Sequence, residues 1–302
     1  GPLFYRVRKT DLGLAAQKMH PPIKIEMKKN ERFVYDSILD KIREITKTDY
    51  FKNIDLLLRL RRGRMMRLRQ CLSYTKLMSS AVYEYDEDLL KGDLSLAEII
   101  KHYDKIETPA KLDALMSLLQ TLLDNGEKVL IWSNFVQTLK LIHNSLNEMG
   151  HKALLIYGAT PIQKRGLSDE WTREEIIRQF LSFESKADVL IANPAALAES
   201  VSLHKACSNA IYYDLSYNCA QYLQSIDRIH RVGGSENKIA NYYFLQYKNT
   251  IDDDILKNVQ TKADNMNRII DQDYPIYSLD MFAEDDELEA YERIFGNRNG
   301  SV

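Results

Sequence analysis

Residues 128–158 read KVLIWSNFVQTLKLIHNSLNEMGHKALLIYG, and this stretch decides the fold class. It opens with a short apolar run at 128–133, which is typical of a buried strand. Residues 135–150 then place apolar side chains at helical spacing and end at Gly150. A second short apolar run follows at 152–158. A strand, an amphipathic helix and another strand in this order indicate parallel strands joined by a crossover helix.

The same alternation continues on both sides of this stretch. Further helices are predicted at 109–126, 172–183 and 250–270, the second with Thr172 as its N-cap. Further strands are predicted at 188–193, 209–214 and 239–247. We therefore expect an α/β fold, a parallel sheet sandwiched by helices. Ligands of such sheets bind at the carboxyl ends of the strands, so the loops there are the candidate sites.

The two ends of the chain have a different character. Residues 1–105 show no strand alternation, and helical patterns at 30–45 and 56–78 predict a helical accessory segment. The second pattern is very basic, and its arginines are Arg59, Arg61, Arg62, Arg64, Arg67 and Arg69. The acidic run at 283–291 predicts a solvated or loosely packed tail. The predicted order is a helical segment (1–105), an α/β domain (106–270) and an acidic tail (271–302).

Composition excludes several classes of protein. The 302 residues carry a net charge of −2, so any surface for nucleic acid must be local. The three cysteines, Cys71, Cys207 and Cys219, form no C-x-x-C pair, which argues against a zinc site and a disulfide framework. No apolar run approaches the roughly 18 residues of a membrane span. We predict no metal site of this chain's own.

The segment QYLQSIDRIHRVGG, residues 221–234, is the strongest functional signal. Gln224, Arg228 and Arg231 stand at i, i+4 and i+7, so a helix would place them on one face. Two neighbouring arginines repel each other, and their guanidinium groups suit phosphate. We therefore expect an anionic ligand there. The alternative is a surface helix with solvated arginines.

These residues resemble the second motor lobe of superfamily-two helicases, and most closely the Swi/Snf-type DNA translocases. The last motif of that family has the form Q-x-x-D/G-R-x-H-R-x-G, which residues 224–233 match. Further blocks follow the family's order: 107–135, 157–165, 176–193, 209–234 and 241–256. Segments 7–14, 31–39 and 58–78 resemble the helical linker between the family's two lobes. The resemblance covers about residues 6–270 and implies a RecA-like fold.

The resemblance also implies roles for the last motif. Arg228 and Arg231 would be arginine fingers that reach the γ-phosphate of ATP held by a first lobe. His230 would couple the nucleotide site to the DNA side, and its alternative is a core histidine satisfied by a neighbour. The residues expected to support the nucleotide are Gln224, Asp227 and Gly233.

Four segments are candidates for contacts with DNA phosphate. The loops after the strands contribute Ser133, Asn134, Thr160, Arg165, Asn193 and Ser202, and the basic helix contributes Arg61, Arg64 and Arg67. Contacts of this kind position a duplex without reading its sequence. Ordinary loop capping is the alternative for Thr160, and a solvated face over apolar neighbours is the alternative for the arginines. The loop at 192–206 departs from the family's Ser/Thr- and Gly-rich pattern.

The sequence has no G-x-x-x-x-G-K-[ST] phosphate loop and no D-E-x-H box. The resemblance places both on a first lobe. We therefore expect the C-terminal lobe of an ATP-dependent double-stranded-DNA translocase, inactive alone. Its cofactors would be ATP and Mg²⁺, held mainly by the first lobe, and its partners double-stranded DNA and that N-terminal RecA-like lobe of the same protein.

Two other interpretations stay open. Another superfamily-two branch, such as a strand-separating helicase or a restriction-type motor, shares the general pattern, although the linker segment argues against it. A catalytically inactive helicase-like lobe that binds nucleic acid or docks a protein is favoured by the altered 192–206 loop. The predicted location is cytoplasmic or nucleoid in a prokaryote and nuclear in a eukaryote, and the glycine pair at 233–234 favours a compact prokaryotic version.

Overall fold

A computed structural model describes most of the chain. The described ranges are 13–48, 53–79, 89, 93–163, 171–182, 184–197, 202–231, 233, 238–271 and 286–296. The chain forms two compact units, each assembled from distant parts of the sequence. The first unit consists of Gly1–Ile23, Leu115–Tyr213 and Leu223–Leu245, and the second of Lys24–Ala114, Asp214–Tyr222 and Gln246–Val302.

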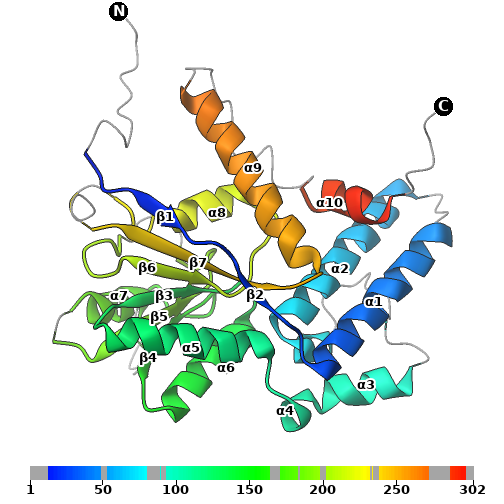
Figure 1. The fold of residues 1–302 in the computed structure, drawn as a ribbon, viewed down its shortest axis with the longest axis horizontal. Coiled ribbons are helices and arrows are strands. Elements are labelled where there is room, and N and C mark those ends of the chain that lie inside the picture. Colours follow the sequence, from blue (N-terminus) through cyan, green and yellow to red (C-terminus); the bar gives the residue numbers. More distant parts are fainter. Residues whose placement is uncertain are drawn as a thin grey trace, which may run out of the picture. The chain divides into compact units, whose positions relative to one another are not determined.

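A parallel sheet is the framework of the first unit. Its strand order is β1-β7-β6-β3-β5-β4, and β2 also pairs with β7 (Figure 1). The strands are β1 (Gln17–Met19), β2 (Ile23–Ile25), β3 (Val129–Trp132), β4 (Lys152–Ile156), β5 (Ala187–Ala192), β6 (Asn209–Tyr212) and β7 (Ala240–Tyr247). β3 lies between β5 and β6, with Val129 opposite Val189 and Asn209. The predicted parallel sheet is confirmed.

The central strands are buried on both faces. All four residues of β3 and all four of β6 are buried, which explains why these strands appear in the sequence as continuous apolar runs. Each of the five predicted strands from residue 128 onward is present in the structure. Their carboxyl ends lie at one edge of the sheet because the strands run parallel.

Helices join and cover these strands. α6 (Val136–Glu148) connects β3 to β4, and α7 (Arg173–Leu181) connects β4 back to β5. These two connections run in opposite directions along the sheet, so right-handed crossovers put the two helices on opposite faces. Thr172 and Glu175 form a reciprocal capping box that starts α7, as the predicted N-cap requires.

Helices dominate the second unit. They are α1 (Lys29–Thr48), α2 (Ile54–Ser73), η2 (Thr75–Ser79), α3 (Leu94–Lys101), α4 (Tyr103–Ile106), α9 (Ile251–Asp271) and α10 (Asp286–Phe295). Two more, α5 (Ala110–Asp124) and α8 (Cys219–Ile226), run from one unit into the other. α2 contacts α1, α9 and α10. No helix within the described ranges has an apolar stretch long enough to cross a bilayer.

The structure corrects two expectations about the ends of the chain. The accessory segment 1–105 is not purely helical, because β1 and β2 join the sheet and Gln17 pairs with Ala240. Strands of three residues are too short for a periodic pattern to reveal them. The part of the acidic run that the structure describes, from Asp286 onward, forms helix α10, in which Ala290 and Tyr291 are fully buried. The predicted domain boundaries at residues 105 and 270 stay a prediction.

Candidate nucleotide and nucleic-acid site

The last motif does not form one continuous helix. α8 ends at Ile226, so only Gln224 of the three predicted face residues is helical. Beyond that point the amide of Arg228 donates to the carbonyl of Ser225 at 3.3 Å, which is the tighter spacing of a final turn. The predicted shared helix face of Gln224, Arg228 and Arg231 is therefore wrong. Both arginines lie in the turns that follow the helix.

Long-range partners explain why the helix ends there. The hydroxyl of Tyr242 on β7 donates to the carbonyl of Ile226 at 2.8 Å. The amide of Leu203 donates to the carbonyl of Arg228 at 2.8 Å. These carbonyls are satisfied by groups from other parts of the chain, so continuing the helix would gain no bonds for them.

The two arginines have different environments. Arg228 is buried, with 9% of its surface exposed, whereas Arg231 is exposed. The guanidinium of Arg231 donates to the hydroxyl of Ser202 at 3.0 Å. Gln224 and Asp227 are exposed as well. The structure thus joins Arg231, which was predicted to contact ATP, to Ser202, which was predicted to contact DNA.

His230 is held by the segment around β1. Its ring is buried, with Nδ1 3.0 Å from the side-chain nitrogen of Gln17 and Nε2 2.7 Å from the carbonyl of Ala15. An amide nitrogen only donates, so Nδ1 accepts and Nε2 carries the proton. These contacts match the alternative of a core histidine with satisfied partners.

Gly233 adopts φ 91°, a conformation that any side chain would strain.

The predicted hydroxyl groups in the strand-end loops cap their own loops. Ser133 is fully buried, and its Oγ accepts from the amide of Phe135 at 3.3 Å. Thr160 is 8% exposed, and its Oγ1 accepts from the amide of Tyr157 at 3.0 Å. Capping, the alternative considered for Thr160, is the role that these bonds describe. Arg165 lies outside the described residues.

Asn193 ties the loop after β5 to the loop after β3. Its side-chain nitrogen donates to the carbonyl of Asn134 at 2.9 Å, and its oxygen accepts from the amide of Ala195 at 2.9 Å. Both asparagines are half-buried. The structure therefore brings these two predicted residues together at the carboxyl edge of the sheet.

Sequence analysis missed Arg173, which organises the same edge. Its guanidinium donates to three carbonyls: Thr160 at 3.1 Å, Gly158 at 3.1 Å and Ala196 at 2.8 Å. It thereby joins the loop after β4 to the loop after β5. A cation in the first turn of a helix is disfavoured by the helix dipole, and that was the signal available in the sequence.

The basic helix α2 is not an open surface. Arg64 is 1% exposed and donates to the hydroxyl of Tyr291 at 2.6 Å, and Arg67 is 8% exposed and donates to Gln70 at 3.1 Å. Arg61 is paired with Glu292. The prediction that Arg61, Arg64 and Arg67 form a free grip for DNA is therefore wrong for Arg64 and Arg67 as they stand. A buried guanidinium needs a partner, and protein groups supply it here.

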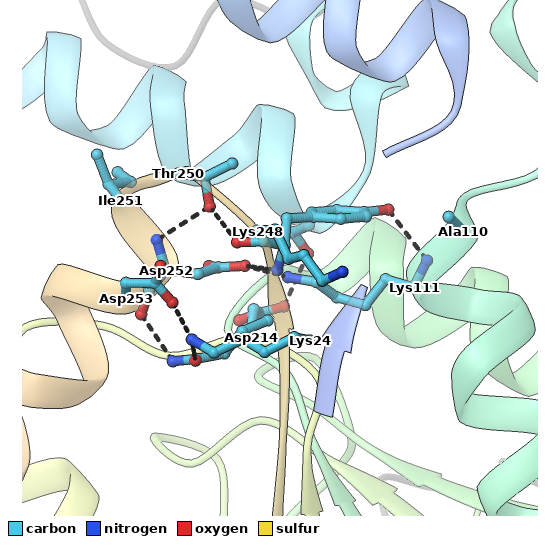
Figure 2. A network of polar contacts seen from close by, with 12 residues as sticks. Lys24, Ala110, Lys111, Asp214, Lys248, Thr250, Ile251, Asp252 and Asp253 are labelled. Carbon is cyan, nitrogen blue, oxygen red and sulfur yellow. Dashed lines mark hydrogen bonds and ion pairs between the residues drawn. The ribbon is translucent and has the colours of Figure 1, made fainter. Parts of the chain in front are cut away.

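A buried polar network at the start of α5 and α9 was also missed (Figure 2). Lys111 donates to Asp252 at 2.8 Å, and the amide of Tyr247 donates to the same carboxylate at 2.9 Å. Burial raises the pKa of Asp252, an effect that the charge of Lys111 opposes. The hydroxyl of Tyr247 also donates to Glu31. This network lies within the second unit, where it joins the start of α5 to the start of α9.

Comparison with known proteins places this geometry in a family. Residues 110–233 match the model described as the helicase conserved C-terminal domain. Residues 110–233 therefore form a helicase C-terminal domain that is homologous to those of Snf2-type helicases. Over 170 residues, 56% of its length, the chain is 32% identical to the ATP-dependent helicase FUN30 of Saccharomyces cerevisiae. It is 29% identical over 54% of its length to Helicase SWR1 of the same yeast. The matched stretches amount to 14% and 10% of these two relatives.

Solved structures share the fold. The C-terminal part of the Fun30 ATPase domain superposes with a TM-score of 0.59 at 21% identity, covering 93% of this chain and 99% of that one. The Sulfolobus solfataricus SWI2/SNF2 ATPase core in complex with double-stranded DNA superposes with a TM-score of 0.56 at 17% identity, covering 95% of this chain and 51% of that one. The predicted RecA-like fold is thus confirmed.

Proposed function

We propose that this chain is the C-terminal lobe of an ATP-dependent double-stranded-DNA translocase. The observation that carries the proposal is the placement of Arg231 in the last motif. Its guanidinium is exposed and steadied by Ser202, three residues beyond the buried Arg228. An exposed, oriented guanidinium in this motif is suited to a phosphate brought by another lobe.

ATP fits this donor set through its γ-phosphate. Arg231, and Arg228 three residues before it, would contact the phosphate, while ATP and Mg²⁺ would be held mainly by a first lobe. Bound ATP supplies the phosphoryl group that is transferred to water. Fixed positive charge at that group stabilises the charge of the transition state, and an arginine finger is worth about 10³–10⁵ in rate.

DNA would lie at the carboxyl edge of the sheet. Asn134 and Asn193 are half-buried there, and the side-chain nitrogen of Asn193 donates to the carbonyl of Asn134. Ser133 and Thr160 would act by shaping the loops, since their hydroxyls cap backbone amides. Such contacts hold the backbone of one strand, so closing and opening two lobes would step a motor along the duplex. The two yeast relatives favour a nuclear location over the prokaryotic version.

The decisive experiment is steady-state ATP hydrolysis by the parent protein saturated with duplex DNA. We expect Arg231→Ala and Arg228→Ala each to lower kcat by about 10³, with a smaller effect on ATP affinity. Arg231→Lys should restore little because a point charge cannot replace the fork. Arg178→Ala, an exposed arginine of α7, is the control. Near-normal kcat in both single variants, with unchanged melting, would contradict the arginine-finger assignment.

Hydrolysis by this chain alone separates the proposal from its rival. We expect no turnover above background with or without DNA, because the phosphate loop of the family is not in this sequence. DNA-stimulated turnover by the chain would contradict a lobe that needs a partner. A parent protein that binds DNA and hydrolyses no ATP would favour the catalytically inactive module.

A further inference from the structure

Helix α10 packs against the arginine-rich helix α2 within the second unit (Figure 1). Arg69 pairs with Glu287 at 2.5 Å, and Arg61, eight residues earlier, pairs with Glu292, five residues later. The pairs run in opposite senses along the two sequences, so the helices are antiparallel. In each pair a positively charged side chain of α2 contacts a negatively charged side chain of α10.

Both buried apolar side chains and ion pairs hold α10 in place. Ala290 and Tyr291 are fully buried and Phe295 is 9% exposed, so they anchor the helix. The Tyr291 ring also faces the guanidinium of Arg61 at 5.3 Å. The side chains of Glu287 and Glu292 are 21% and 55% exposed, so neither belongs to the buried apolar anchor. Neutralising these two charges therefore leaves the anchor intact.

The arginines in these pairs require an anion. The side chain of Arg69 is 6% exposed and that of Arg61 is 19% exposed. Removing the anionic partner of a largely buried charge is costly, so another anion in the place of Glu287 and Glu292 would favour the departure of α10. Arg61 and Arg69 are separated by about 12 Å along the helix axis, a distance over which duplex DNA presents more than one phosphate.

We propose that Arg61 and Arg69 form a binding surface for the phosphate backbone of duplex DNA, and that α10 occupies this surface as an internal anionic competitor. The choice of DNA as the partner rests on the proposed function. The acidic side chains of α10 would then cover the two arginines until DNA displaces them. Binding of DNA to these arginines would not depend on its sequence and would weaken with salt. Arg64 and Arg67 stay interior residues with protein partners.

The test measures duplex DNA binding by the full chain across a salt series. Glu287→Gln/Glu292→Gln should raise affinity at least about fivefold at low salt and steepen the salt dependence by about two counterions. The control is Glu98→Gln/Glu174→Gln, which makes the same change in net charge at exposed carboxylates of α3 and α7. Adding Arg61→Gln/Arg69→Gln to the α10 variant should abolish the gain.

A gain no larger than that of the control, or a gain that survives loss of Arg61 and Arg69, would overturn the proposal. A gain for heparin without a gain for DNA would overturn the assignment of the ligand. Should the α10 variant fail to fold, hydrogen exchange of residues 286–295 in the unaltered chain decides: DNA should accelerate it, and no change would overturn the proposal. The ATPase of the Arg231 variants tests the translocase function separately.

Discussion

The ammonium group of Lys111 donates a hydrogen bond to the carboxylate of Asp252 at 2.8 Å, although 141 residues separate them in the chain. The side chain of Lys111 is 0% exposed and that of Asp252 is 8% exposed. The same carboxylate accepts from the amide of Tyr247, and Lys111 lies over the Tyr247 ring at 4.6 Å. The pair thus joins the start of α5 to the start of α9.

Removing one member of this pair should destabilise the chain strongly. We expect Lys111→Met to lower the free energy of unfolding by about 3–5 kcal/mol, because it leaves a buried carboxylate without its cation. The double variant Lys111→Met/Asp252→Leu should cost clearly less than the sum of the two single changes. Urea unfolding of all three variants measures this coupling. Additive costs would show that the two groups do not depend on each other.

Glu31 should make stability depend on pH in an unusual direction. Burial raises its pKa above the ordinary value of 4.5, although it accepts bonds from Tyr247, Lys28 and Ala110. A raised pKa means that the folded chain binds this proton more tightly than the unfolded chain. Its contribution to stability is therefore fully present below pH 4.5 and is lost as the pH rises through the raised pKa.

Unfolding of the wild type and of Glu31→Gln as a function of pH checks this sign. The difference in unfolding free energy, wild type minus variant, should become smaller as the pH rises from 4.5. Glu98→Gln, at an exposed site, should show no such trend. A difference that grows with pH would mean that the pKa of Glu31 is lowered in the folded chain.

Arg173 should act as a positioning residue for the strand-end loops. Arg173→Met removes three charge-assisted bonds, each worth about 1.5–3 kcal/mol, so the loops after β4 and β5 should open more often. We expect faster hydrogen exchange at residues 158–160 and 196–197, and weaker DNA binding at every salt concentration. Arg178→Met, in the same helix and exposed, is the matched control. Unchanged exchange with weaker DNA binding would instead indicate a direct contact of Arg173 with DNA.

His230 should stabilise the strand β1. His230→Leu removes its bonds to Gln17 and Ala15, so we expect faster amide exchange in Gln17–Met19 and a loss of about 1–3 kcal/mol of stability. The DNA-stimulated fraction of ATPase activity in the parent protein distinguishes the roles. A purely structural histidine leaves that fraction unchanged, whereas a coupling residue lowers it.

Local sequence patterns were sufficient for most of the fold. β3 and β6 are four-residue runs with every side chain buried, and α6 shows helical spacing. Residues close together in the sequence therefore suffice to predict these two strands and this helix. The last motif carried the resemblance to Snf2-type helicases because its residue types fall in register over ten residues. β1 and β2 could not be predicted, since three residues contain too little periodicity.

The sequence by itself determined the α/β sheet, the order of its strands along the chain and the resemblance to Snf2-type helicases. The tertiary structure alone decided that α8 ends at Ile226, that Arg228 is buried while Arg231 is exposed, and that α10 covers α2. Each of these outcomes depends on a partner far away in sequence, such as Tyr242 for Ile226 or Glu287 for Arg69. Local propensity carries no information about such partners, because hydrogen bonds and ion pairs of buried groups form only where the folded chain brings them together.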